Sequence, residues 1–97
     1  MAKRERKIVN IICSELYEKQ LKEILDSIIK EDFKAAKSFK LYLDTLILNM
    51  PTKVKKYKTS IFFNDDNIKD LECQGYTIPF LLDEENDIFI ILGILRK

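Results

Sequence analysis

The chain is 97 residues long and carries 17 lysine and arginine residues against 16 aspartate and glutamate residues, for a formal net charge of +1. This length predicts one domain, 1–97, with a single modest core. The near-neutral balance excludes a basic field over the whole surface but does not exclude a local basic patch. Histidine is absent, which excludes His-ligated zinc, Ser/His or Cys/His nucleophilic pairs and histidine acid–base catalysis.

Cysteine spacing and short apolar runs indicate the environment of the chain. Cys13 and Cys73 lack the C-x-x-C spacing of a zinc or redox site, so we expect two small buried thiols in a reducing cytosol, with no metal and no cofactor. The charged leader 1–7 is followed by too few apolar residues for a signal peptide, and the apolar run 88–95 is too short to cross a bilayer. We therefore expect a cytoplasmic protein without a membrane partner.

The first part of the chain predicts a strand and then a helix. Residues 7–13 are rich in β-branched side chains, which favours a short strand. Ser14 stands at the N-cap position of a helix, and acidic residues follow in its first turn. Apolar side chains then recur at steps of three and four along one face, which comprises Tyr17, Leu21, Ile24 and Ile28 and is widened by Leu25.

A second amphipathic helix follows after a short polar break. Asp32 is its expected N-cap, and Pro51 ends it because proline disfavours helical geometry at the preceding residue. Its core face comprises Ala36, Phe39, Leu43, Leu46, Ile47 and Met50. Two such helices with so short a connection must fold back as an antiparallel hairpin.

Leu41 and Leu48 lie outside that core face. At about 100° per residue they project roughly opposite to Leu43 and Met50. Single exposed leucines are common on protein surfaces, so exposure without a role is one interpretation. The other is a narrow apolar ridge that contacts a partner segment.

Residues 52–70 carry the least regular pattern. We expect a long connection whose apolar residues Ile61, Phe62 and Phe63 tuck against the body of the domain. Before them comes a basic cluster that comprises Lys53, Lys55, Lys56, Tyr57 and Lys58. Lysines neutralise phosphates and a tyrosine can stack on a base, so this cluster is the best candidate for nucleic-acid contact. A solvated loop that keeps a sheet edge soluble is the alternative.

The last part of the chain predicts β structure. A short strand over 69–73 ends at Gln74-Gly75, a strand over 76–82 ends in the acidic turn 83–87, and the run 88–95 is typical of a buried strand or one central in its sheet. Pro79 cannot donate a ladder hydrogen bond, which predicts an open side or a bulge beside it. The order β-α-α-β-β-β predicts an α+β fold, in which a helical hairpin packs on a small, mainly antiparallel sheet.

The residues by themselves do not support an enzyme. The carboxylates at 65–66 and 83–87 lie in turns, whereas a general acid needs a carboxylate whose pKa is raised by desolvation. Gly75 and Gly93 are the only glycines, and they cannot form a phosphate-cradling loop.

The element order resembles the RelE/ParE superfamily of bacterial type II toxins. The resemblance rests on the helix that starts at Ser14-Glu15, the helix end over 46–51, the segment Gly75-Tyr76-Thr77-Ile78-Pro79-Phe80, the acidic turn and the final run 88–96. It covers almost the whole chain. It implies a small antiparallel-rich sheet packed against a helical hairpin, and an antitoxin whose extended or helical tail wraps the toxin.

The resemblance also implies one of two activities. RelE-like members bind the ribosomal A site and cleave mRNA, whereas ParE-like members block DNA gyrase without that catalytic set. This chain has Thr77 where nuclease members commonly carry arginine, and Leu95-Arg96 where they often carry histidine–arginine. No residue has an evident role as a base at neutral pH. If the chain is a nuclease, its candidate catalytic residues are Lys69, Tyr76, Arg96 and Lys97.

We therefore predict a ParE-like toxin that is neutralised by a cognate antitoxin and binds DNA gyrase or a comparable essential target. The expected partner contacts are Leu41, Leu48, Phe62 and Phe63. A ribosome-dependent mRNA endonuclease is the alternative, and an inactive member of the family is the third reading. For the oligomeric state, the sequence is compatible with a homodimer and with a hetero-oligomer that includes the antitoxin.

Overall fold

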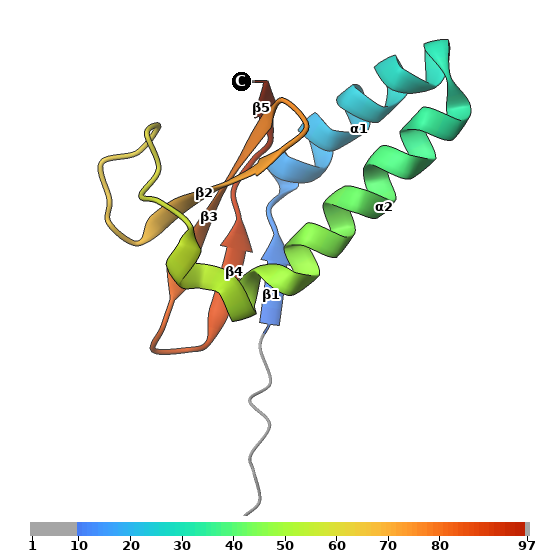
Figure 1. The fold of residues 1–97 in the computed structure, drawn as a ribbon. Coiled ribbons are helices and arrows are strands. Elements are labelled where there is room, and N and C mark those ends of the chain that lie inside the picture. Colours follow the sequence, from blue (N-terminus) through green and yellow to red (C-terminus); the bar gives the residue numbers. More distant parts are fainter. Residues whose placement is uncertain (1–9, 97) are drawn as a thin grey trace, which may run out of the picture.

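A computed structural model describes residues 10–96 of the chain (Figure 1). The predictions that concern residues 7–9 and Lys97 lie outside the described residues. The elements follow one another as β1 (Asn10–Cys13), α1 (Glu15–Glu31), α2 (Phe33–Asn49), the 3₁₀ helix η1 (Met50–Lys56), β2 (Ile68–Cys73), β3 (Tyr76–Asp83), β4 (Ile88–Ile91) and β5 (Leu95–Arg96). The α+β fold with a helical hairpin on a small sheet, which the sequence predicts, is confirmed.

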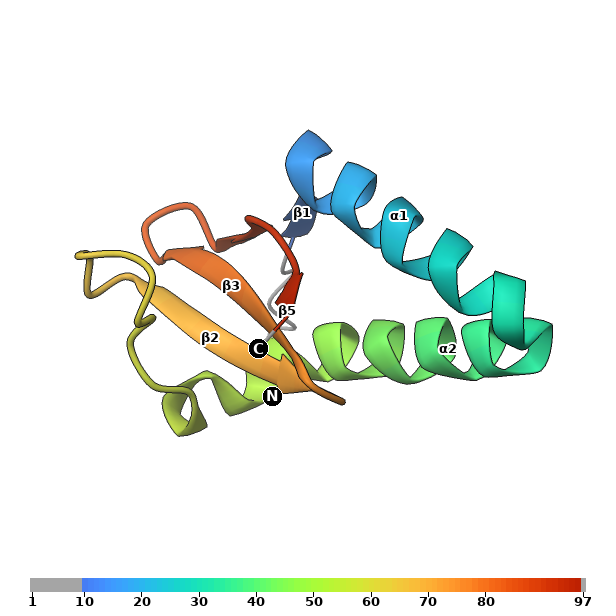
Figure 2. The ribbon, with the colours of Figure 1, turned by 90° about the horizontal axis from the view of Figure 1, so that it is seen from above.

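The strands form one mixed sheet in the order β1-β4-β3-β2, and β5 also pairs with β3. β1 runs parallel to β4, whereas β3 is antiparallel to β2, β4 and β5. β4 is central, as expected of an apolar run, because β1 and β3 lie on its two sides. The helices lie on one side of the sheet (Figures 1 and 2).

The run 88–95 is interrupted, so the prediction of one continuous strand is wrong in this detail. Phe80 pairs with Ile91 and Thr77 pairs with Leu95, which leaves two residues of β3 opposite the three residues 92–94. One extra residue on one strand is a β-bulge. The cause is Pro79, whose carbonyl accepts a hydrogen bond from the Leu92 N–H at 2.9 Å but which has no N–H to return. The bulge predicted beside Pro79 is confirmed.

The start of α1 is fastened to this bulge. Ser14 caps the helix, because its Oγ accepts a hydrogen bond from the Tyr17 N–H at 3.0 Å, and the same hydroxyl donates to the Leu92 carbonyl at 2.9 Å. Gln20 Oε1 accepts a hydrogen bond from the Ile94 N–H at 2.9 Å. A Cβ on Gly93 would lie 2.8 Å from Gln20 Oε1, so a larger residue here would displace the Gln20 amide from this contact.

Asp32 joins the two helices and caps the second one. Its carboxylate accepts hydrogen bonds from the N–H groups of Lys34 and Ala35, at 3.0 and 3.2 Å, as its sequence position predicts. The helices meet at this turn and diverge toward the sheet (Figure 2). The predicted core face of α2 is confirmed, with five buried members and a partly buried Leu46; the buried members are Ala36, Phe39, Leu43, Ile47 and Met50.

Three expectations need correction. Pro51 ends the α-helix as predicted, but the connection expected to be irregular begins with the 3₁₀ helix η1, because proline is compatible with a first helical turn. Ile61, Phe62 and Phe63 do not tuck against the body: all three are exposed, and Ile61 is 85% exposed. The backbone of this loop is instead held by polar contacts, among them Ser60 N–H to the Ile68 carbonyl at 2.7 Å and Ile61 N–H to Asp70 Oδ2 at 3.2 Å. Of the two cysteines, only Cys73 is buried, whereas Cys13 is exposed.

Candidate functional site

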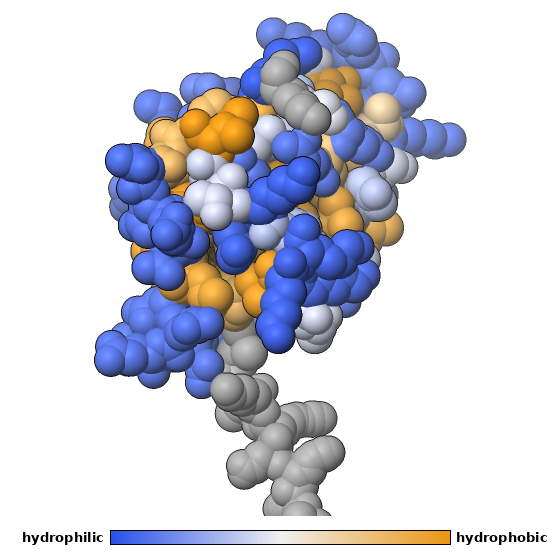
Figure 3. All heavy atoms as spheres, turned by 60° about the vertical axis from the view of Figure 1, so that its left-hand side comes forward, coloured by the Kyte–Doolittle hydropathy of each residue, from blue (hydrophilic) through white to orange (hydrophobic). Residues whose placement is uncertain are grey.

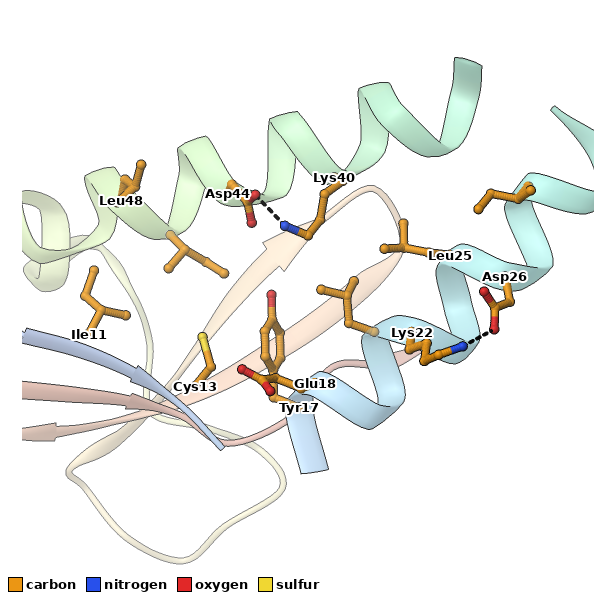
Figure 4. Close-up of a pocket in the computed structure, with 13 residues that line it drawn as sticks. Ile11, Cys13, Tyr17, Glu18, Lys22, Leu25, Asp26, Lys40, Asp44 and Leu48 are labelled. Carbon is orange, nitrogen blue, oxygen red and sulfur yellow. Dashed lines mark hydrogen bonds and ion pairs between the residues drawn. The ribbon is translucent and has the colours of Figure 1, made fainter. Parts of the chain in front are cut away.

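The divergence of the helices opens a groove between α1, α2 and the end of β1. Its volume is about 740 Å³, and Figure 4 shows its residues facing one another across the opening. We call it the hairpin groove. It is lined by Ile11, Cys13, Tyr17, Glu18, Leu21, Lys22, Leu25, Asp26, Ile29, Lys40, Asp44, Ile47 and Leu48.

The floor of the hairpin groove is apolar apart from one hydroxyl and one thiol. Tyr17, Leu21 and Ile47 belong to the buried core, and Cys13 lies beside them at the end of β1 (Figure 4). Burial raises the pKa of the Cys13 thiol, and the nearby carboxylates of Glu18 and Asp44 raise it further. This thiol therefore stays protonated at neutral pH and behaves as a small apolar group.

Charged side chains stand along both walls of the groove. On α1, Lys22 Nζ contacts Asp26 Oδ2 at 3.0 Å, and on α2, Lys40 Nζ contacts Asp44 Oδ2 at 2.6 Å. Both pairs span one helical turn and are largely exposed, so each contributes only a few tenths of a kcal/mol, roughly 0.3–0.5, to stability. The charges cancel within each pair, and Glu18 adds one further negative charge to the α1 wall.

A second hollow of about 390 Å³ continues the groove toward the hairpin turn and shares Leu25, Ile29, Lys40 and Asp44 with it. We call it the tip hollow. Its further residues are Phe33, Ala36, Lys37 and Leu41. The groove and the hollow together make a mainly apolar channel along the hairpin.

The two leucines of the predicted apolar ridge border this channel. Leu48 lines the hairpin groove and Leu41 lines the tip hollow, and each is 70% exposed. Sequence patterning missed the channel itself, as well as Ile29 and Phe33 on its border. Both residues are large, apolar and exposed. In the sequence they lie outside the core faces predicted for the two helices, and this is the signal that could have identified them.

The other predicted partner contacts, Phe62 and Phe63, lie on the loop between η1 and β2, away from the hairpin groove (Figures 1 and 2). The side of the molecule that carries this loop is largely hydrophilic and shows small, separate apolar patches (Figure 3). The structure therefore does not bring the four predicted partner contacts together on one surface.

The basic cluster divides into an exposed and a packed part. The lysines Lys53, Lys55, Lys56 and Lys58 are exposed on η1 and just after it. The ring of Tyr57 instead packs edge-to-face on Phe80, with the ring centroids 5.6 Å apart, and burial raises the pKa of its hydroxyl. The cluster thus offers charge for phosphate contact, while its aromatic ring belongs to the core.

The nuclease candidates are only partly brought together. Arg96 Nη2 donates a weak hydrogen bond to Tyr76 Oη at 3.4 Å, and its guanidinium lies 5.5 Å from the centre of that ring. Lys69 pairs with Phe80, four positions along β3 from Tyr76 and therefore roughly 13 Å away. Its Nζ donates to the Tyr57 carbonyl at 3.4 Å. Lys97 lies outside the described residues.

Arg96 and Tyr76 border a small hollow of about 320 Å³, which Gln20, Glu23 and Ser27 of α1 also line. Arg96 and Tyr76 together could stabilise charge on a phosphate, and Glu23 is the one carboxylate among the residues of this hollow. Over residues 10–96, no group of three or more cysteine or acidic side chains is placed to hold a metal ion. No helix in that range is long and apolar enough to cross a membrane.

Comparison with known proteins gives matches among solved structures alone. No protein-family model matches the chain, and no curated protein matches it. A chain from the chromosomal ParDE TA system of P. aeruginosa has a TM-score of 0.72 at 12% identity and covers 91% of this chain and 95% of its own length. A chain of the toxin–antitoxin complex RelBE2 from Mycobacterium tuberculosis has a TM-score of 0.58 at 12% identity, with 92% and 98% covered. The chain has the RelE/ParE fold that the sequence resemblance implies.

Proposed function

We propose that this chain is the toxin subunit of a bacterial type II toxin–antitoxin system and that its cognate antitoxin occupies the hairpin groove. The main support is the RelE/ParE fold over more than nine-tenths of the chain, together with an open apolar groove on it. A fold by itself does not define a function, but a groove of this kind is the usual site for an amphipathic segment of a partner.

Leu48 and Leu41 are the proposed antitoxin contacts. Each is 70% exposed in the free chain, and full burial of a leucine side chain contributes about 1.5–3 kcal/mol. Together with Ile29 and Phe33, which are also exposed, they form a border that a partner would remove from water.

For the activity, we propose ParE-like binding of an essential target such as DNA gyrase. The loop residues Phe62 and Phe63 are the proposed target contacts, because they are exposed on a loop whose backbone is already ordered by hydrogen bonds. Their separation from the hairpin groove would let antitoxin and target be recognised by different surfaces. The lysines of the basic cluster stay candidates for contact with nucleic acid bound to that target.

A ribosome-dependent mRNA endonuclease is the second candidate, and the contact between Arg96 and Tyr76 favours it. The arrangement has a cation and a phenol, and Glu23 of α1, which lines the same hollow, is the one carboxylate there that could accept the proton of a ribose 2′-hydroxyl. The position of Lys69 roughly 13 Å along the sheet weighs against a shared site. An inactive family member is the third possibility.

Induced expression in a bacterial host tests these alternatives. Growth arrest that is relieved by co-expression of the protein encoded next to this gene would support the toxin–antitoxin assignment. Arrest with intact transcripts and a DNA-damage response would support the gyrase-type activity, whereas cuts at codon positions in translated mRNA would show the nuclease. Absence of arrest would leave only the inactive member.

Arg96→Ala with Lys97→Ala separates the two active alternatives further. We expect this double variant to arrest growth as the wild type does, because the proposed target contacts lie elsewhere. Loss of arrest, with the variant still folded and still bound by the neighbouring protein, would favour the nuclease.

A further inference from the structure

The buried hydroxyl of Tyr17 is unpaired at the floor of the hairpin groove. The residue is 3% exposed, and its Oη has no hydrogen-bond partner among residues 10–96. Leaving a buried hydroxyl without a partner costs about 1–3 kcal/mol, and buried tyrosine hydroxyls usually find a partner. The free chain therefore carries a polar group for which a ligand can supply the missing bond.

This hydroxyl is directed into the groove rather than into the sheet. Figure 4 shows the phenol rising from α1 toward the part of α2 that carries Lys40 and Asp44. The Asp44 carboxylate is already engaged by Lys40 at 2.6 Å. Burial, and then the neighbouring Cys13 and Asp44, raise the pKa of the Tyr17 hydroxyl. At neutral pH it is a protonated donor that seeks an acceptor.

The surroundings indicate what kind of acceptor fits. Three carboxylates and two lysines line the groove, and each lysine is already paired with one carboxylate, so the charge of Glu18 is left unbalanced and disfavours a further carboxylate. A neutral oxygen, from a side-chain amide or a hydroxyl, carries no charge that Glu18 would repel. The walls are two helices of 17 residues each, or about 25 Å in length. Most of the lining belongs to these two helices, and only Ile11 and Cys13 come from the edge strand β1, which favours a helix over an added strand as the occupant.

We propose that Tyr17 is a specificity-determining anchor of the hairpin groove, whose hydroxyl donates a hydrogen bond to a neutral polar side chain on an amphipathic helix of the cognate antitoxin. This inference rests on the proposed function. The apolar residues of that helix cover Leu21, Leu25 and Leu48, and its single polar residue meets Tyr17. A partner helix with an apolar residue at this position leaves the hydroxyl unpaired and binds less tightly, which provides discrimination between partners.

Tyr17→Phe tests the proposal because it removes the hydroxyl and keeps the ring. In the free chain the variant loses only an unpaired group, so its thermal midpoint should be equal to or above that of the wild type. In the complex it loses a real hydrogen bond, so affinity for the protein encoded by the neighbouring gene should fall about tenfold. Opposite effects on the two measurements are the expected result.

Tyr42→Phe is the matched control, because Tyr42 is an exposed tyrosine on α2 that lines neither the groove nor the tip hollow. It should change neither the midpoint nor the affinity. Titration calorimetry and thermal unfolding of the wild type and both variants provide the data.

Alkylation of Cys13 shows independently whether the groove is filled. Cys13 is exposed in the groove and Cys73 is buried, so complex formation should slow maleimide labelling of Cys13 while Cys73 stays unlabelled throughout. Protection of Cys13 with equal affinities for wild type and Tyr17→Phe would overturn the anchor and keep the proposed function. A lower midpoint for the free Tyr17→Phe chain would show an internal partner for the hydroxyl and also overturn it. Absence of binding by the wild type would overturn both.

Discussion

The two faces of α1 make opposite kinds of contact. One face is closed by hydrogen bonds: Ser14 and Gln20 satisfy the backbone of the bulge at Leu92 and Ile94, and Gly93 leaves room for this approach. The other face looks across the hairpin groove, where Tyr17 has an unpaired hydroxyl and apolar side chains line an open space. The closed face fixes where α1 lies on the sheet, and the open face is available to a partner.

The same contrast exists on α2 and yields the largest expected effect. Leu43 is fully buried, whereas Leu48 is 70% exposed. Leu43→Ala should lower the free energy of unfolding by about 2–5 kcal/mol, since it removes a buried side chain and leaves a cavity. Leu48→Ala should change it by less than about 0.5 kcal/mol and should instead weaken antitoxin binding. Urea unfolding of both variants measures the difference, and equal losses would erase the distinction between the two faces.

The closed face of α1 can be tested at the bulge. Gly93→Ala places a Cβ 2.8 Å from Gln20 Oε1, so it should displace Gln20 and cost about 1–3 kcal/mol, the penalty of an unpaired buried N–H at Ile94. In a double-mutant cycle with Gln20→Ala, the two losses should be strongly non-additive because both remove the same contact. Full additivity would mean that the bulge and α1 are energetically independent.

A substitution at the turn between α1 and α2 should lower the stability less than one at the bulge. Asp32→Ala removes the carboxylate that caps α2 and should destabilise the chain by about 1 kcal/mol. Asp26→Ala is the control, because it removes an exposed carboxylate of α1 that is paired with Lys22 one turn away and should cost less than about 0.5 kcal/mol. Similar losses from both variants in thermal unfolding would assign no special role to the cap.

The smallest effect concerns alkaline pH. Tyr17 has a pKa raised above its ordinary value of 10.0, so the folded state keeps its proton while the unfolded state releases it. The stability that this proton contributes to the folded state is fully present below pH 10 and is lost as the pH rises through the pKa of Tyr17 in the folded state. At pH 10.5 the loss in the free energy of unfolding is less than about 1 kcal/mol. Tyr17→Phe should flatten this decline in pH-dependent urea unfolding. An unaltered decline in Tyr17→Phe would assign it to other groups, such as Tyr57 or the cysteines, whose pKa values are also raised.

Much of the fold could be predicted because its signals are local. Ser14 and Asp32 cap helices through groups two or three residues away, and Pro79 predicts a bulge because it lacks an N–H on its own. The core face of α2 follows from the helical period. The loop 61–63 was predicted wrongly, since apolar residues suggest burial, whereas hydrogen bonds hold this backbone and leave the side chains exposed.

The amino-acid sequence by itself determined the two α-helices, the main strands, their order, the helix caps and the exposure of Leu41 and Leu48, because each depends on the spacing of residues along one segment. It did not determine η1 or the division of the run 88–95 into β4 and β5. Only the tertiary structure decided that the helices diverge into a groove, that Tyr17 has a buried hydroxyl without a partner, and that Arg96 meets Tyr76 while Lys69 lies elsewhere. These features depend on the angle between helices and on strand register, which arise from packing between segments distant in the sequence.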